Sequence, residues 1–291
     1  MKPFDFVLYG FVVIGWSSSW LPLKWQVGTV APEVSLIWRF VLAGSLMFLI
    51  GWLTKRRLAL PLWGHGVAMA LGVFLFSTNF ALFYYASQSL ASGLLAVVFA
   101  SASLVNLFYG AVLFRTRIRL LGLVAAVLGF GGVLLLYWPE IASSRAALGA
   151  LALCLCGTFS FCTGNMISSA AQRRDLPVIG STAWGMLYGA GFMFIVSLLR
   201  GHELMIEMSW RYIGGGLWLA VFSSVLAFSA YLTLLGRIGA SRAAYATVIF
   251  PPFALMISTV VEGYQWTSFA FIGLPLVLLG IVTINLRGAR S

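Results

Sequence analysis

The sequence carries very little charge for its length. Only 9% of its 291 residues are charged and 61% are hydrophobic, with a mean hydropathy of +1.00, whereas a soluble domain carries about 25% charged residues. A water-soluble fold of this length has too little interior to bury so much apolar surface. Because apolar runs of about 20 residues match the hydrocarbon thickness of a bilayer, the composition predicts a membrane-embedded protein.

Acidic and histidine side chains are scarce as well, with seven Asp and Glu residues and two histidines. His65 and His202 fall at the edges of apolar runs, and the carboxylates fall at run ends or in loops. A membrane-embedded lipid-modifying enzyme needs such groups buried beside a nucleophile, so an enzyme is only the alternative from another class. The chain also lacks the G-x-x-x-x-G-K-[ST] phosphate loop, which excludes ATP hydrolysis by that motif.

The cysteines and the basic residues exclude two further classes of site. Cys154, Cys156 and Cys162 lie in one apolar segment without the spacing of a metal site, so we expect core residues and neither metal nor cofactor. The net charge of +11 comes from groups of two or three basic residues between apolar runs. Nucleic-acid binding would instead need a basic face on a soluble domain.

Long apolar runs predict an all-α membrane protein with ten transmembrane helices. The connections between them are too short to hold a soluble catalytic or regulatory domain. A monomer is compatible with this pattern, and the partners we expect are a small-molecule substrate and the lipid bilayer, with no nucleic acid. The expected spans are residues 5–27, 33–53, 63–86, 91–113, 118–138, 146–170, 177–199, 211–236, 241–262 and 266–286.

The loop charges predict the orientation, because cytoplasmic loops carry an excess of Lys and Arg. Thirteen basic residues fall on one side of the predicted spans, and only Arg145, Arg200 and Arg211 fall on the other. We therefore expect a multi-pass protein of a bacterial inner membrane with both termini in the cytoplasm. The thirteen are Lys2, Lys55, Arg56, Arg57, Arg115, Arg117, Arg119, Arg173, Arg174, Arg237, Arg242, Arg287 and Arg290.

The two halves of the chain repeat each other. Residues 122–129 and 273–280 share the pattern G-L-x-x-x-x-L-G, and the pairs Ala91-Ser92 and Ala240-Ser241 are 149 residues apart. Because each half has an odd number of spans, namely five, the second half crosses the membrane in the opposite orientation to the first. Such inverted repeats occur in many secondary transporters. The alternative is chance recurrence of Gly, Ala and Leu in apolar helices. We expect repeats at residues 1–145 and 146–291, each of five transmembrane helices.

The first half of the chain carries Gly15-Trp16-Ser17-Ser18, Arg39-Phe40, residues 81–85 and 91–93, and residues 122–136. The second half carries Ala240-Ser241, Pro251-Pro252-Phe253, Glu262 and residues 273–280. Together these motifs, which are spread over the whole chain, resemble the drug/metabolite transporter superfamily, and specifically its ten-helix EamA-type exporters.

The first half departs from the family pattern, because members usually have a proline in both the fourth and ninth spans and a glutamate after both. Ser103 and Phe114 stand near those places here. Within the superfamily the chain looks most similar to aromatic amino-acid exporters of the YddG type.

This resemblance implies a secondary transporter that exports small neutral or zwitterionic metabolites, with aromatic amino acids first, by alternating access. The alternative within the superfamily is a multidrug or organic-cation exporter. A polyanionic cargo would need several converging basic residues, and only Lys24 and Arg39 lie inside the predicted spans.

Candidate pathway residues lie on helical faces that combine aromatic and small polar side chains. Such faces also occur where helices pack closely or where aromatics simply fill a core, so packing is the alternative. Buried Trp and Tyr carry N–H and O–H groups that need partners, which favours a pathway for them. The predicted substrate-binding and pathway residues are Trp16, Trp20, Ser77, Tyr84, Gln88, Phe99, Ser103, Asn106, Thr158, Asn165, Ser224, Tyr231 and Tyr245.

Two further features of the spans are predicted to matter. Pro251 and Pro252 fall near the middle of the ninth span, where each removes a backbone donor, so we expect a hinge there, with a plain kink as the alternative. Arg39 is the one charge well inside a span. It either binds a substrate carboxylate or ties helix ends together through carbonyls; the structural role is favoured because the family has an arginine here irrespective of substrate.

Overall fold

The computed structural model describes residues 3–113, 120–238 and 246–288, and all regular structure within these ranges is helical. The first half contains α1 (Pro3–Ser17), α2 (Trp20–Trp25), α3 (Pro32–Leu53), α4 (Leu62–Val73), η1 (Phe74–Thr78), α5 (Asn79–Ala86), α6 (Ser92–Ala100), α7 (Ala102–Leu113) and α8 (Leu120–Ser143). The second half contains α9 (Arg145–Gln172), α10 (Val178–Leu199), α11 (Trp210–Trp218), η2 (Leu219–Ala227), α12 (Phe228–Ile238), α14 (Ala246–Glu262) and α15 (Ser268–Gly288).

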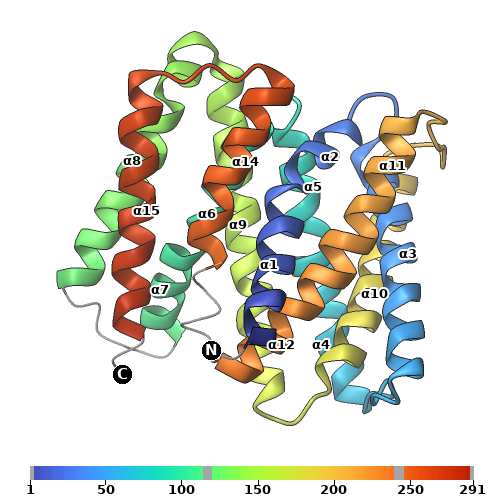
Figure 1. Cartoon of the computed structure of the whole chain (residues 1–291). Coiled ribbons are helices and arrows are strands. Elements are labelled where there is room, and N and C mark those ends of the chain that lie inside the picture. The colour runs from blue at the N-terminus through green and yellow to red at the C-terminus, as the bar shows by residue number, and fades with distance from the viewer. Residues whose placement is uncertain (1–2, 114–119, 239–245, 289–291) are drawn as a thin grey trace.

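These elements form one bundle whose helices run between two ends (Figure 1). We call the end at which α2 lies the upper end and the end at which α1 begins the lower end. Seven helices of the described chain are long and apolar enough to cross a membrane, and residues 249–262 and 268–283 form two shorter apolar helices. The all-α membrane fold predicted from the sequence is confirmed.

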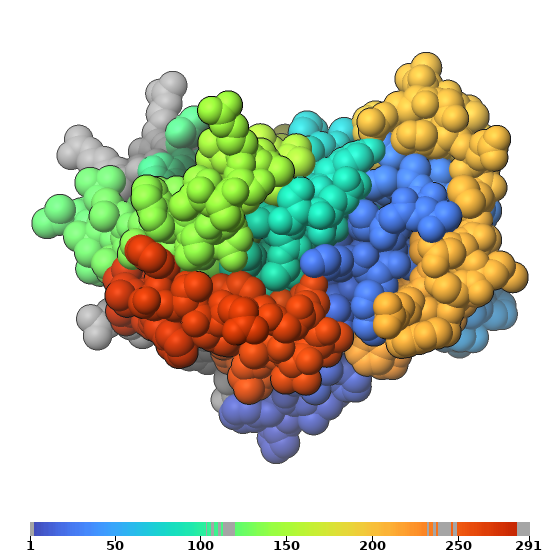
Figure 2. Space-filling view, turned by 90° about the horizontal axis from the view of Figure 1, so that it is seen from above, coloured from blue at the N-terminus to red at the C-terminus, as the bar shows by residue number. Residues whose placement is uncertain are grey.

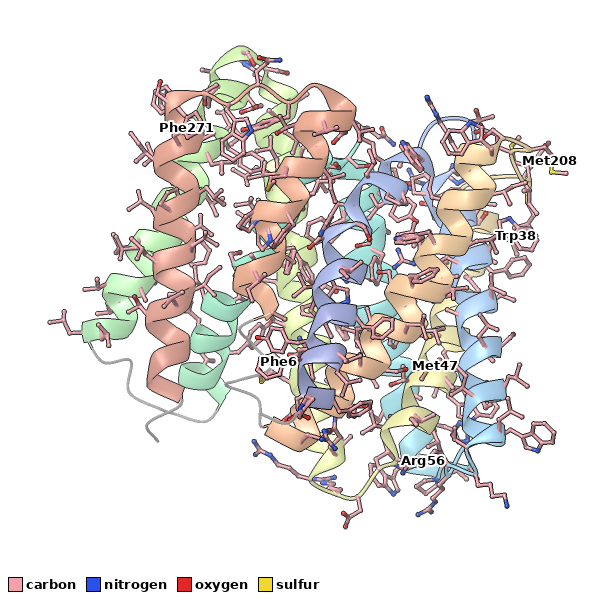
Figure 3. The ribbon with its side chains drawn as sticks, in the orientation of Figure 1. Phe6, Trp38, Met47, Arg56, Met208 and Phe271 are labelled. Carbon is pink, nitrogen blue, oxygen red and sulfur yellow. The ribbon has the colours of Figure 1, made fainter. Side chains whose placement is uncertain are left out.

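Apolar side chains cover the outside of the bundle, as a bilayer requires. Trp38 and Phe271 project away from the helices at the edges of the molecule (Figure 3), and the Phe271 side chain is 64% exposed. A soluble protein would not leave so many large apolar residues in contact with water.

Several of the predicted spans are not regular α-helices. Residues 18–19 separate α1 from α2, Ser101 separates α6 from α7, and the third and eighth spans contain the π-helices η1 and η2. At the break in the first span, Ser18 Oγ donates to Ile14 O at 2.6 Å and Ser19 Oγ donates to Trp16 O at 2.9 Å. Irregular backbone at membrane depth is tolerated only where protein groups or a cavity satisfy it, so these places are candidates for function.

Equivalent spans of the two halves cross each other at glycines. The helices α8 and α15 lie side by side in Figure 1, and a Cβ added at Gly132 would meet Gly273 O at 2.6 Å. The helices α6 and α14 touch at Gly93, where an added Cβ would meet Leu255 Cα at 2.8 Å. A Cβ added at Gly280 of the repeated glycine pattern would meet Ala125 O at 2.7 Å and Gly129 N at 2.8 Å, so the pattern marks helix packing rather than a ligand site.

Replacing Gly132 with alanine is expected to lower the thermal midpoint of the protein. The new methyl group would lie 2.6 Å from Gly273 O and 2.7 Å from Val277 N, which are backbone atoms, so α8 and α15 would have to separate. Such overpacking costs about 1–3 kcal/mol. Gly131 is the matched control, because nothing lies within 4 Å of a Cβ added there.

Gly131→Ala is expected to keep or raise the midpoint, since alanine favours a helix over glycine by about 1 kcal/mol. Melting curves of the two purified variants in one detergent decide the comparison. A midpoint for Gly132→Ala that equals that of Gly131→Ala would contradict the close contact between α8 and α15.

Candidate functional site

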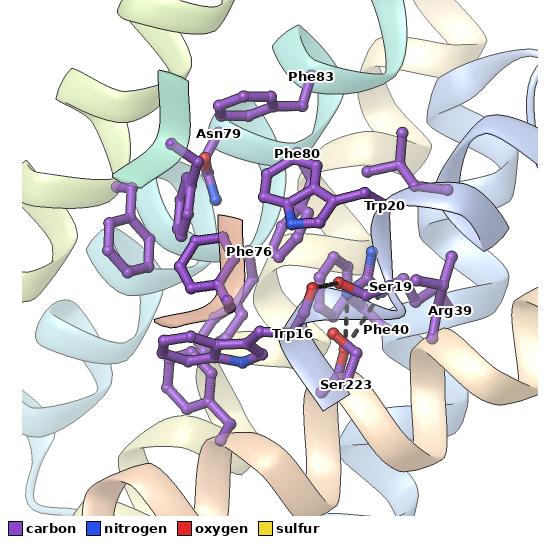
Figure 4. A pocket seen from close by; sticks show the side chains of 17 residues that line it. Trp16, Ser19, Trp20, Arg39, Phe40, Phe76, Asn79, Phe80, Phe83 and Ser223 are labelled. Atoms are coloured by element: carbon purple, nitrogen blue, oxygen red, sulfur yellow. Dashed lines mark hydrogen bonds between the residues drawn. The ribbon is translucent and has the colours of Figure 1, made fainter. Parts of the chain in front are cut away.

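A cavity lined mainly by aromatic rings lies at the centre of the bundle (Figure 4). Its free volume is about 50 Å³, whereas ligand pockets commonly measure about 300–1,000 Å³. We call it the aromatic cavity. The described residues that line it are Trp16, Ser19, Trp20, Leu23, Arg39, Phe40, Phe76, Asn79, Phe80, Phe83, Phe99, Phe161, Leu219, Ser223, Ser224, Phe228 and Phe250.

Ring contacts join the two halves of the chain across this cavity. Trp16 packs against Tyr231, with ring centroids 5.0 Å apart, and lies edge-on to Phe250 at 6.2 Å. Phe99 of α6 meets Phe161 of α9 at 4.6 Å and Trp20 of α2 at 5.4 Å. Because these rings belong to elements of both halves, a relative movement of the halves must change the shape of the cavity.

The π-helices place side chains in the cavity from both halves. Phe76 comes from η1, whereas Ser223 and Ser224 come from η2. The widened turn of η1 is stabilised by hydroxyl groups: Ser77 Oγ donates to Gly72 O at 2.5 Å, and Ser160 Oγ donates to Phe74 O at 2.7 Å. A π turn inserts an extra residue and so redirects the face that a regular helix would present.

Arg39 is the only charged residue among the described residues of the cavity wall. It is 2% exposed, and its Nε and Nη2 donate to Ser224 Oγ at 3.2 and 3.1 Å. Its guanidinium lies over the rings of Phe80 and Phe40, with 4.3 and 5.2 Å to the centroids. Arg39 therefore links α3 in the first half with η2 in the second through a hydroxyl group.

Four of the predicted pathway residues line the aromatic cavity together with Arg39, namely Trp16, Trp20, Phe99 and Ser224. Tyr231 borders the cavity, because its ring packs on Trp16.

Other predicted residues lie elsewhere in the described structure. Ser77 and Tyr84 are fully buried and are not among the residues that line the cavity, and Thr158 Oγ1 donates to Cys154 O at 2.8 Å within α9. Asn165 is half-buried on α9, and Gln88 is exposed in the turn that follows α5. The side chains of Ser103 and Asn106, and the whole of Tyr245, lie outside the described residues.

Sequence reasoning missed part of the wall supplied by the third span. Phe76, Asn79, Phe80 and Phe83 face the cavity, whereas the face inferred from the sequence ran through Ser77. The spacing of three and four residues among these aromatic positions was the available signal. The face marked by these aromatic positions is displaced by one residue from the face that we inferred through Ser77. The π-helix η1 lies within the same span.

Two ion-pair clusters join helices at the upper end of the bundle. Glu262 of α14 pairs with Lys24 Nζ at 2.9 Å and accepts from Ser92 N at 3.0 Å and Ser258 Oγ at 2.7 Å. We call Lys24, Ser92, Ser258 and Glu262 the upper cluster. Seen from above, the segments that meet at this end leave no opening between them (Figure 2).

A second cluster at the upper end links α3 to the end of α10. Glu33 is 2% exposed, pairs with Arg200 Nη1 at 2.5 Å and accepts from Tyr85 OH at 2.6 Å. The hydrogen bond that Arg200 donates to the Glu33 carboxylate is the main cause that raises the pKa of the Arg200 guanidinium above its usual value. Both clusters join groups that are far apart in the sequence, so they hold separate spans together at this end.

The lower end holds a wider groove. Its volume is about 520 Å³, and it lies where Met47 and Arg56 are labelled in Figure 3. Its described wall is Met47, Arg56, Arg57, Pro177, Val178, Ile179, Ser229, Thr233 and Arg237. Among the described residues, the clusters around Glu262 and Glu33 lie at the upper end and this groove lies at the lower end.

Comparison with known proteins gives a consistent family assignment. The model of the EamA-like transporter family matches residues 6–138 and again residues 148–286. A solved crystal structure superposes on this chain with a TM-score of 0.72 at 14% sequence identity, and the match covers 100% of this chain and 99% of the other chain. This likeness shows the fold alone.

Curated relatives are similar over nearly their whole length. Protein PagO of Salmonella typhimurium is 24% identical over 94% of this chain and 90% of its own length. A "Probable amino-acid metabolite efflux pump" of Escherichia coli is 25% identical over 98% of this chain and 96% of its own length. The "Uncharacterized inner membrane transporter YedA" of Escherichia coli is 26% identical over 98% of this chain and 92% of its own length.

Proposed function

Because the chain belongs to the EamA-like transporter family of the drug/metabolite transporter superfamily, it is a membrane transporter, and we propose that it exports amino acids. The proposed cargo is small and neutral or zwitterionic, with aromatic amino acids first, as in exporters of the YddG type. Export would run across a bacterial inner membrane with both termini in the cytoplasm. The family and the names of its relatives indicate a transporter rather than an enzyme, and a transporter implies a small-molecule substrate and a lipid bilayer.

The observation that carries this proposal is the chemistry of the aromatic cavity. Ten of its described lining residues are aromatic, three are serines, and Arg39 is the only charge. A sugar nucleotide or another polyanion would need several cations in one place. An aromatic amino acid needs stacking surface for its ring and a few polar groups for its zwitterionic end, and this wall supplies both.

An organic cation is the second candidate, because aromatic rings also attract cations. Arg39 argues against it, since its guanidinium already lies over Phe80 and Phe40 and would repel a second positive charge. A lipid-modifying enzyme has still less support. Among the described residues of the cavity wall there is no carboxylate, histidine or cysteine to act as base or nucleophile.

We propose that transport proceeds by alternating access of two inverted five-helix repeats, residues 1–145 and 146–291. The small volume of the aromatic cavity means that it must widen to admit an amino acid. Pro251 and Pro252 lie inside α14 and are the proposed hinge of the second half. With the offset of 149 residues between the repeats, Ser101 of the first half is equivalent to Phe250 of the second half, which precedes the two prolines. The helix break at Ser101 is therefore the equivalent hinge candidate of the first half, although it contains no proline.

The experiment that tests the function is a substrate panel on the purified protein in liposomes. Vesicles preloaded with one unlabelled compound are given the same compound in labelled form, and exchange is followed for Phe, Tyr, Trp, Thr, Met, an organic cation and a sugar nucleotide. We expect exchange of the aromatic amino acids at rates well above those of protein-free vesicles. Exchange of the sugar nucleotide or the cation with indifference to every amino acid would refute the proposal.

A further inference from the structure

Arg39 is buried with part of its hydrogen-bonding capacity unused. Its Nη1 has no hydrogen-bond partner, although the residue is 2% exposed and lines the aromatic cavity. Burying a guanidinium in a low-dielectric site costs free energy unless its donors have hydrogen-bond acceptors and its charge has a partner of opposite sign. Such a group at a cavity wall is an incomplete site that a ligand can complete.

The protein's own side chains do not neutralise this charge in the described structure. The ion pairs of Asp5, Glu33 and Glu262 use other cations at the two ends of the bundle. Within the described chain, the hydrogen bonds of Arg39 go to the Ser224 hydroxyl rather than to helix-end carbonyls. The Ser224 hydroxyl, the neighbouring Tyr84 hydroxyl and two ring faces surround the guanidinium, but these neutral groups supply no negative charge.

A second unused donor lies on the same wall. Trp20 Nε1 also lacks a hydrogen-bond partner, and Trp20 is 7% exposed. Figure 4 shows the indole of Trp20 and the side chain of Arg39 both lining the cavity, from α2 and α3 respectively. Unpartnered donors on the cavity wall, one of them cationic, suit a ligand with acceptor oxygens such as a carboxylate better than they suit an ammonium group.

We propose that Arg39 is the carboxylate anchor of the aromatic cavity. The ligand class is then a small carboxylate with an apolar or aromatic body, which Arg39 Nη1 binds by a charge-assisted hydrogen bond. The body of the ligand stacks among rings such as Trp16 and Phe99. This inference rests on the proposed function only in taking the cavity as the place where cargo binds.

The anchor makes one chemical distinction that a purely structural arginine does not make. Phenylalanine and 3-phenylpropionate carry the carboxylate, whereas phenethylamine has a similar ring and chain with only the ammonium group. A hydrogen bond to a charged group is strong enough to separate these ligands by about tenfold or more in affinity. A role limited to holding α3 against η2 would leave the three ligands unseparated.

The test is binding of these three compounds to the purified wild-type protein, measured as the ligand concentration that half-saturates the thermal stabilisation. We expect 3-phenylpropionate and phenylalanine to stabilise the protein at concentrations about tenfold or more below that of phenethylamine. In Arg39→Gln this preference should disappear. In Trp20→Phe, which keeps a ring but loses the N–H donor, the preference should shrink and remain in the same direction.

The wild-type measurement decides the proposal even if Arg39→Gln does not fold. Equal binding of phenethylamine and 3-phenylpropionate, or no binding of any carboxylate, would overturn the anchor. If phenylalanine is exchanged in liposomes but phenethylamine and 3-phenylpropionate bind equally well, the anchor is overturned and the proposed function stands. Selective carboxylate binding that depends on Arg39, without exchange of any amino acid, would support the anchor and refute the proposed function.

Discussion

Replacing Trp16 with alanine is expected to lower phenylalanine exchange per folded molecule by about tenfold or more. Trp16 is 8% exposed and contacts Phe228, Tyr231 and Phe250, with ring centroids 5.0–6.4 Å apart. Each such ring pair contributes about 0.5–1.5 kcal/mol beyond its buried area. Loss of this indole removes both the stacking surface for cargo and a contact between the two halves.

The control for this variant is Trp52→Ala. Trp52 lies near the end of α3 and is 70% exposed toward the surroundings of the bundle. It is therefore expected to leave the exchange rate near that of the wild type. The rates are compared in liposomes at equal amounts of folded protein, determined by melting curves of the same preparations. Equal rates for Trp16→Ala and Trp52→Ala would show that cargo does not pass the aromatic cavity.

Replacing Glu262 with alanine is expected to open the upper end of the cavity. The carboxylate is the common partner of Lys24, Ser92 and Ser258, so its loss removes the ion pair between α14 and α2 and the hydrogen bond between α14 and α6 at this end. The Glu262 side chain is 12% exposed and its partner Lys24 is 36% exposed, so solvent screens the pair and its loss costs less than the loss of a fully buried pair. If about 1 kcal/mol of this cost falls on the upper-closed state alone, the ratio of open to closed molecules rises about fivefold.

A cysteine at position 19 reports this opening, because Ser19 lines the aromatic cavity. The native residues Cys154, Cys156 and Cys162 are first replaced by serine or alanine, and an impermeant thiol reagent is added to intact cells. Labelling is expected to rise in Glu262→Ala and to stay low in Glu203→Ala, which removes an exposed carboxylate from a loop. Labelling that rises only in inverted vesicles would contradict the predicted orientation.

The fold could be predicted from the sequence because its main determinant is local. A bilayer accepts only apolar runs of sufficient length, and the ends of those runs can be read directly from the residues. The family prediction is confirmed for the EamA-like family, whereas the closer likeness to the YddG type stays a prediction. The repeated glycines predicted the repeat itself, and the contact of Gly280 with Gly129 now gives their physical reason.

The site could be predicted only in part, because its position depends on departures from regular helices. A helical face through Trp16 and Trp20 led to the cavity. The face inferred from the sequence ran through Ser77 and Tyr84, which are fully buried and do not line the cavity, in the span that contains the π turn of η1. Gln88 was placed on the same face, but α5 ends at Ala86 and the following turn leaves Gln88 exposed.

The ion pairs of the upper end lay beyond sequence reasoning for a different reason. Lys24 and Glu262 are close in space, but 238 residues separate them in the chain, and Glu33 and Arg200 are similarly distant. Each of these charges falls at a span end, where solvent or a headgroup would satisfy it equally well. Only the packing of the helices shows which cation meets which carboxylate.

The most direct measurement of the central claim is amino-acid efflux from cells. Cells that produce the wild type, Trp16→Ala or no transporter are loaded with a phenylalanine-containing dipeptide, which their peptidases hydrolyse, and phenylalanine in the medium is followed over time. The account predicts efflux faster than in cells without the transporter for the wild type, and efflux at the transporter-free rate for Trp16→Ala at matched folded protein. Wild-type efflux no faster than in transporter-free cells would contradict export of amino acids through the aromatic cavity.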